Sequence, residues 1–86
     1  MSNPRYTQEQ ITAAIHGDET ALRFLYESTQ DRVTQTVRSM IRDEDAVLDI
    51  VQDSFVKAFQ NLDKLEKPEY FFAWMRRIAS NTALNY

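Results

Sequence analysis

Hydrophobic residues recur along this chain at intervals of three and four, the spacing of an amphipathic helix rather than of a strand. One such series is Leu22, Leu25, Tyr26, Val33, Val37, Met40 and Ile41, and a second is Val47, Val51, Phe55, Ala58 and Leu62. One glycine and two prolines leave little material for tight hairpins. The pattern therefore predicts an all-α fold, a compact bundle of about four helices.

Capping signals divide the first half of the chain into two helices. Thr7 is followed three residues later by Gln10, which predicts a capping box at the start of a short helix that ends near Gly17. Asp18 is expected to cap a long second helix, whose apolar series runs to about Arg42.

The second half also divides into two helices, with a loop between them. Asp43 or Asp45 is a suitable cap for the third helix, whose apolar series fades after Leu62. Proline suits a first helical turn, so the fourth helix is expected to start at Pro68 and to run to the chain end. Because the apolar rhythm persists to Tyr86 without a stop signal, we expect the chain to be part of a longer protein.

Length and composition favour one soluble domain over residues 1–86. With 43% hydrophobic and 27% charged residues, the 86-residue chain lies near the averages of globular proteins. Its apolar runs are far shorter than the roughly 20 residues of a membrane helix. The polar start MSNPRYTQEQ lacks the hydrophobic stretch of a signal peptide. These features predict a cytoplasmic protein that does not act in a membrane.

Residues for catalysis or metal binding are scarce. The chain has no cysteine, and His16, its one histidine, is expected at the surface. Thiolate zinc sites, His clusters and histidine triads are therefore excluded. Acid pairs such as Asp49 and Asp53 have no nucleophile, metal ligand or phosphate loop near them in sequence. We expect a protein that is not an enzyme and that needs no cofactor and no metal.

Charge is distributed unevenly, although the net charge is only −3. Five acids and no base lie in one short stretch of the third helix, and the region 70–86 carries Arg76 and Arg77 but no acid. A net-acidic domain gains little from the counterion release that drives duplex binding. The first stretch suits a basic protein partner and the second tolerates a polyanion, while the simpler alternative for any charge run is a solvated helix face.

The third helix predicts a protein-binding face. Opposite its core series lie Asp49, Gln52, Asp53 and Val56. An exposed β-branched residue among acids and amides resembles an interface, where a small desolvated centre is ringed by polar groups. The alternative is a single valine scattered on the surface.

The fourth helix predicts a face for single-stranded nucleic acid. Trp74, Arg77 and Asn81 fall on one side at spacings of three and four. Aromatic and guanidinium planes can stack on bases, arginine contacts phosphates, and an asparagine amide both donates to and accepts from a base edge. The alternative is that most of the aromatic residues in this part of the chain, including Trp74, pack in the core.

Three segments in order resemble region 2 of the extracytoplasmic-function sigma factors of the sigma-70 family. They are HGDETALRFLYES (residues 16–28), DIVQDSFVKAFQNLDKL (residues 49–65) and PEYFFAWMRRIASNTALNY (residues 68–86). The last contains the signature Trp-x-x-Arg-Ile-Ala-x-Asn, from Trp74 to Asn81. The resemblance implies a helical domain of transcription initiation.

The same resemblance implies two partners. It implies docking on the clamp helices of the RNA polymerase β′ subunit, with Asp49, Gln52 and Asp53 at the matching positions. It also implies recognition of the minus-ten promoter element as a non-template single strand, with one base flipped into a pocket beside the loop of residues 63–68. Pocket and strand contacts are then implied for Asn81, Lys57, Arg76 and Arg77 and for the loop residues Asp63, Lys64, Leu65 and Lys67.

The chain departs from the family pattern at three points. Leu65 stands where the family often has an aromatic residue, which puts base stacking there in question. Thr29 replaces a common tyrosine and is expected to affect packing. Residues 1–86 do not include the helix-turn-helix domain that reads the minus-35 element, so we do not expect them to bind a promoter on their own.

Two rival interpretations remain. In the first, the chain is a helical protein-interaction module without a nucleic-acid role, whose acidic face binds a partner such as an anti-sigma factor. The net charge favours this rival, and the signature from Trp74 to Asn81 favours the sigma factor. A helical enzyme domain is a weaker rival, which a bound cofactor or metal would support.

Overall fold

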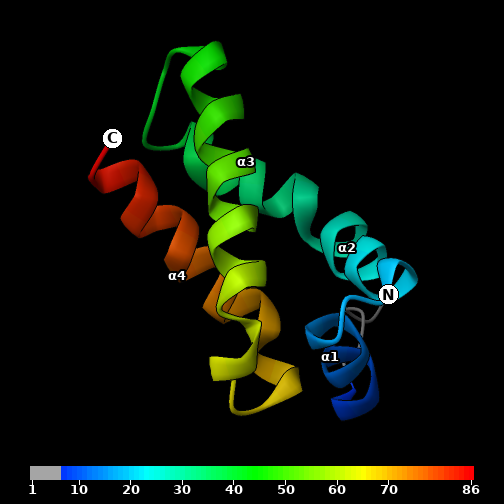
Figure 1. Ribbon diagram of the computed structural model, residues 1–86. Helices are drawn as coiled ribbons and strands as arrows, with labels where there is room; N and C mark the ends of the chain where they lie inside the picture. Colours follow the sequence, from blue (N-terminus) through cyan, green and yellow to red (C-terminus); the bar gives the residue numbers. More distant parts are fainter. Residues whose placement is uncertain (1–6) are drawn as a thin grey trace, which may run out of the picture.

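The computed structural model describes residues 7–86, and its regular structure over that range is entirely helical. The helices are α1 (Gln8–Ile15), α2 (Glu19–Arg38), α3 (Glu44–Gln60) and α4 (Phe71–Leu84), with two 3₁₀ turns, η1 (Leu62–Lys64) and η2 (Pro68–Tyr70), between the last two. In Figure 1, α3 crosses in front of α2 and α4, and α1 lies beside the foot of α3. The all-α prediction of about four helices is confirmed.

The predicted capping residues are confirmed at the starts of the first two helices. Thr7 Oγ1 accepts from the backbone N–H of Gln10 at 3.2 Å, and Gln10 Oε1 accepts from the N–H of Thr7 at 2.9 Å. Gly17 then turns the chain at φ +86°, a left-handed conformation that residues with a Cβ rarely adopt. Asp18 Oδ1 accepts from the N–H of Ala21 at 3.1 Å and starts α2.

The α2–α3 connection begins earlier than predicted. α2 ends at Arg38 rather than near Arg42, because the Met40 N–H bonds to the Val37 carbonyl at 2.9 Å and tightens the last turn. The chain then runs to Asp43, the first of the two candidate caps, whose carboxylate accepts from the N–H of Asp45 at 3.0 Å.

An ion pair closes this connection. Arg38 Nη2 lies 2.6 Å from Glu44 Oε2, and Arg38 Nε donates to both carboxylate oxygens at 3.2 Å. The hydrogen bond from the guanidinium lowers the pKa of Glu44, and the same bond raises the pKa of Arg38. Because both side chains are 54% exposed, water screens the attraction and the pair contributes little to stability.

The fourth helix begins later than predicted. Pro68 opens η2, in which the Tyr70 N–H bonds to the Lys67 carbonyl at 3.0 Å, and α4 begins only at Phe71. The prediction of a start at Pro68 was wrong by one turn, because proline is equally suited to a 3₁₀ turn that leads into a helix. α4 ends at Leu84, just short of the chain end.

The core lies where α2, α3 and α4 meet. All five residues of the predicted α3 series are buried, and Phe71, Met75 and Ala79 supply the α4 side at 0% exposure. Two predicted core residues of the second helix are instead at the surface, Tyr26 at 36% and Met40 at 37% exposure. Met40 lies beyond the early end of α2, so helical spacing no longer applies to it.

Thr29 is fully buried and its hydroxyl donates to the Leu25 carbonyl at 2.7 Å. A buried hydroxyl is costly without a partner, and this bond within α2 supplies one.

Among the helices that the structure describes, none is both long enough and apolar enough to cross a lipid bilayer.

Candidate partner-binding and nucleic-acid interfaces

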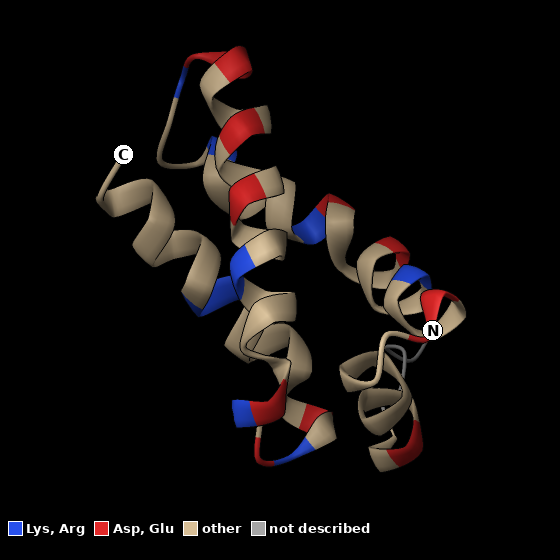
Figure 2. Cartoon of the chain, viewed as in Figure 1, with Lys and Arg blue, Asp and Glu red and all other residues tan. Residues whose placement is uncertain are grey.

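The outer side of α3 carries the predicted protein-binding residues, here called the α3 face. Asp49, Gln52 and Asp53 are exposed, and Val56 is 48% exposed. Figure 2 shows acidic bands along the first half of α3. The predicted exposure of Val56 among acids is therefore confirmed.

The α3 face continues into a groove that sequence reasoning missed. A cavity of about 550 Å³ lies between α2 and α3, and Tyr26, Leu48, Gln52 and Val56 are among its lining. Leu48 is 55% exposed, and the Tyr26 ring meets the Phe55 ring edge-on at a centroid distance of 4.8 Å. Leu48, Gln52 and Val56 are four residues apart and therefore lie on one side of the helix, and this spacing could have indicated the groove.

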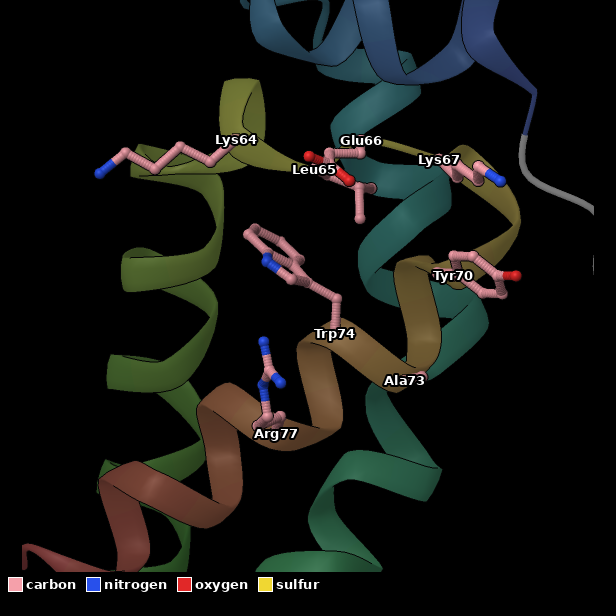
Figure 3. A pocket seen from close by; sticks show the side chains of 8 residues that line it. All are labelled: Lys64, Leu65, Glu66, Lys67, Tyr70, Ala73, Trp74 and Arg77. Atoms are coloured by element: carbon pink, nitrogen blue, oxygen red, sulfur yellow. The ribbon is translucent and has the colours of Figure 1, made fainter.

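A second set of residues surrounds a cavity of about 690 Å³ at the loop after α3, here called the loop cavity. Its lining is Lys64, Leu65, Glu66, Lys67, Tyr70, Ala73, Trp74 and Arg77. Figure 3 shows the Trp74 indole rising from α4 toward the loop, with Arg77 one turn further along the helix. Five predicted strand-binding residues thus meet at one site, while Asp63 is exposed nearby but is not part of the lining.

A smaller cavity of about 360 Å³ adjoins the first along α4, here called the α4 cavity. It is lined by Lys57, Asn61, Lys64, Trp74, Ile78, Asn81, Thr82 and Asn85. Lys64 and Trp74 line both cavities and so form the wall between them. Asn81, which the resemblance placed in a pocket beside the loop, lines the α4 cavity, and the loop residue Lys64 lines the same cavity.

Lys57 lies between the α3 face and the α4 cavity. Its Nζ is 3.2 Å from Asp53 Oδ2 and donates to Thr82 Oγ1 at 3.4 Å. An exposed pair with this i,i+4 spacing is weak, so the ammonium group is readily drawn to a stronger anion.

Arg76 lines neither of these two cavities. It lines a separate cavity of about 360 Å³ with Phe72, Ala73, Arg77 and Ser80. The Arg32 guanidinium from α2 stacks over the Phe72 ring at 3.8 Å from its centroid on this side of α4. Arg77 therefore lines both this cavity and the loop cavity, whereas Arg76 does not line the loop cavity.

The aromatic residues of this region divide between core and surface. Phe71 is fully buried, Phe72 and Trp74 are half-buried, and Tyr70 is 56% exposed. The Trp74 ring lies against Phe71 at a centroid distance of 6.1 Å, which leaves part of the indole in contact with solvent. Packing thus accounts for Phe71, while Trp74 and Tyr70 remain accessible to a ligand.

The described residues contain no group of three or more His, Cys, Asp or Glu side chains arranged to hold a metal ion. His16 is exposed, as predicted, and its Nδ1 lies 2.8 Å from the Thr12 carbonyl oxygen.

Comparison with known proteins identifies the family. Residues 25–86 match the family described as Sigma-70 region 2. The chain belongs to this family. Over 86 residues it is 36% identical to an ECF RNA polymerase sigma-E factor of Salmonella typhimurium (strain 14028s) and 35% identical to the one of Escherichia coli (strain K12). Both alignments cover 100% of this chain and 44% of the relative, so the chain spans under half the length of these sigma factors.

A solved structure supports the sigma-70 fold. It is the NMR structure of an engineered region 2 of sigmaE in complex with GTAAAA, which is 35% identical to this chain, with a TM-score of 0.82. The match covers 100% of this chain and 90% of that one. The resemblance seen in the sequence is therefore confirmed for both family and fold.

Proposed function

We propose that this chain is the region 2 domain of a sigma factor, which acts in the cytoplasm by binding RNA polymerase and holding the minus-ten promoter element as a non-template single strand. The observation that carries the proposal is the pair of adjoining cavities around Trp74, where cations, an aromatic face and an asparagine amide converge. The role is one of binding rather than of catalysis.

The α3 face is the proposed site for the clamp helices of the β′ subunit. Asp49 and Asp53 offer negative charge to a basic partner, and Val56 offers an apolar centre that docking would remove from water. Opposite charges on the two surfaces would steer the encounter and set the register.

The surfaces of α4 suit a single strand better than a duplex. With a net charge of −3, the domain cannot neutralise many phosphates at once. Affinity must then come from contacts to exposed bases, which an unpaired strand offers and a duplex hides. In this proposal Trp74 stacks on a base, Asn81 reads a base edge, and Lys57, Lys64 and Arg77 contact phosphates.

Fluorescence anisotropy tests the proposal directly. The labelled single strand GTAAAA, a scrambled strand of equal composition and the duplex of the first would each be titrated with the 86-residue chain. We expect weak binding to the single strand, a modest preference over the scrambled one, and none to the duplex.

Trp74→Ala should lose most of this binding, because stacking is worth about 1–3 kcal/mol per base. Tyr86→Ala is a matched control, since Tyr86 is an exposed aromatic residue of the same region that lines neither cavity. Equal affinity for strand and duplex would refute the base-capture role. If the unchanged chain bound no strand but still bound a β′ clamp fragment, the interaction module would be favoured instead.

A further inference from the structure

One acidic side chain lines the loop cavity, that of Glu66. It belongs to the segment between η1 and η2, and its neighbours in the lining include Lys64, Lys67 and Arg77. Within residues 7–86, no hydrogen bond or salt bridge joins its carboxylate to another group. An exposed carboxylate that is paired with none of these cations is available to a ligand.

The Glu66 carboxylate lies on the side of the cavity where a base stacked on Trp74 would sit. Figure 3 shows its carboxylate beside Leu65 and above the Trp74 indole, with Lys64 on one side and Lys67 on the other. The Lys67 ammonium lies 6.0 Å from the centroid of the Tyr70 ring, toward the far edge of the cavity. The space over the indole is therefore bordered by one acceptor from Glu66 and by donors at its margins.

Donors and acceptors differ in what they can distinguish among bases. An ionised carboxylate only accepts hydrogen bonds, whereas lysine and arginine only donate them. Cytosine, adenine and guanine each carry an amino group that donates. Thymine has no amino group, and carbonyl oxygens flank its ring N–H. A carboxylate beside the base therefore attracts an amino group and repels the carbonyl oxygens of thymine.

We propose that Glu66 sets the base preference of the loop cavity by accepting a hydrogen bond from the amino group of an unpaired base, so that the cavity takes cytosine, adenine or guanine and disfavours thymine. This rests on the proposed function, because it requires that single-stranded DNA enters the loop cavity. Glu66 is thus a specificity residue in a segment where the cations alone would favour carbonyl-bearing bases.

The test replaces each position of the strand GTAAAA in turn by thymine, or, at the position that already holds thymine, by cytosine. Affinities are measured by anisotropy for the unchanged chain and for two variants. For the unchanged chain, thymine at one position should cost about fivefold in affinity, the lower part of the range for a base contact because Glu66 is exposed to solvent.

In Glu66→Gln this thymine penalty should fall below about twofold, because an amide can also donate to a carbonyl oxygen. Glu69→Gln removes the same charge from an exposed residue that does not line the cavity, and it should keep the full penalty. Both substitutions are at exposed positions, and circular dichroism would verify that the helical content is unchanged.

The outcomes separate this inference from the proposed function. If strands bind but no position disfavours thymine, or if the two variants behave alike, the role of Glu66 is refuted and base capture stands. If no strand binds at all, the proposed function fails and this inference fails with it.

Discussion

Two neighbouring helices of this domain present opposite surfaces. The exposed side of α3 is acidic with an apolar centre at Val56, whereas α4 has no acid and places Arg77 beside an accessible indole. Figure 2 shows the difference as acidic bands on α3 and basic ones on α4. A net charge of −3 describes neither surface, so the partners of such a domain are better inferred from each helix separately.

The two surfaces also differ in how they are built. The α3 face comes from residues of one helix at intervals of three and four. The loop cavity draws its lining from η1, the following segment, η2 and α4, and the α4 cavity adds Lys57 from α3. The first surface therefore depends only on α3 being helical, and the second depends on how α3, the loop that follows it and α4 pack together.

Removing a side chain from the core beneath both surfaces should have the largest effect on stability. Phe71 begins α4 and is fully buried, so Phe71→Ala should lower the free energy of unfolding by about 3–5 kcal/mol. Urea denaturation followed by circular dichroism would measure this change. Val56→Ala, at a half-exposed position, should change stability by less than about 0.5 kcal/mol. Similar losses in both variants would contradict the assignment of Val56 to the surface.

Reversing one charge should disable the α3 face alone. Asp53→Arg should weaken binding to a purified β′ clamp fragment by roughly tenfold, because a cation would meet the partner's basic surface. Calorimetry would give the affinity, and strand binding, measured in parallel, should be retained. Glu27→Arg makes the same change at an exposed position of α2 that lines none of these cavities. An unchanged affinity in Asp53→Arg would count against the α3 face.

Two substitutions on α4 should differ in kind. Asn81→Ala should cost the cognate strand about 1–3 kcal/mol and flatten its preference over a scrambled strand, because an amide reads base edges. Arg77→Ala should weaken both strands nearly equally and reduce the salt dependence, because the role proposed for Arg77 is to contact phosphates. Anisotropy at several salt concentrations separates the two patterns. If Asn81→Ala keeps the preference intact, the α4 cavity does not read sequence.

The smallest expected effect concerns the ion pair that joins α2 to α3. The guanidinium of Arg38 lowers the pKa of Glu44, so the pair stabilises the fold above the ordinary pKa of glutamate, about 4.3. This contribution is lost as the pH falls through the lowered pKa of the folded state. Glu44→Gln should therefore lower the thermal midpoint slightly at pH 7 and leave it unchanged near pH 2. A difference that persists at low pH would show that the pair is not its cause.

Local signals in the sequence predicted local structure well. The Thr7 capping box, the Asp18 cap and the buried α3 series depend on a few adjacent residues, and all are confirmed. The end of α2 at Arg38 and the 3₁₀ turn at Pro68 depend on how the chain meets the next helix, which periodicity does not encode. The same reason explains why the exposure of Tyr26 was missed.

The candidate site was predictable to the same extent. The exposure of Val56 followed from its place on the helical wheel of α3. The wall that Trp74 and Lys64 form between two cavities, and the entry of Glu66 into one of them, depend on how the loop folds back over α4. An isolated glutamate in a loop carries no periodic signal, so its place in the lining could not be predicted.

The shortest α-helix, α1, affects the stability of the loop after α3. α1 precedes the residues that match the family, yet it packs against η1, where Ile11 and Leu62 are each 1% exposed. A helix this short is not stable alone, so α1 depends on its packing against α2 and η1, and its release is a local opening event. The η1 turn includes the bond from the Leu65 N–H to the Leu62 carbonyl at 3.1 Å. The amide hydrogen of Leu65 should then exchange at a rate similar to that of the α1 amides. Its protection would report how often the whole loop opens.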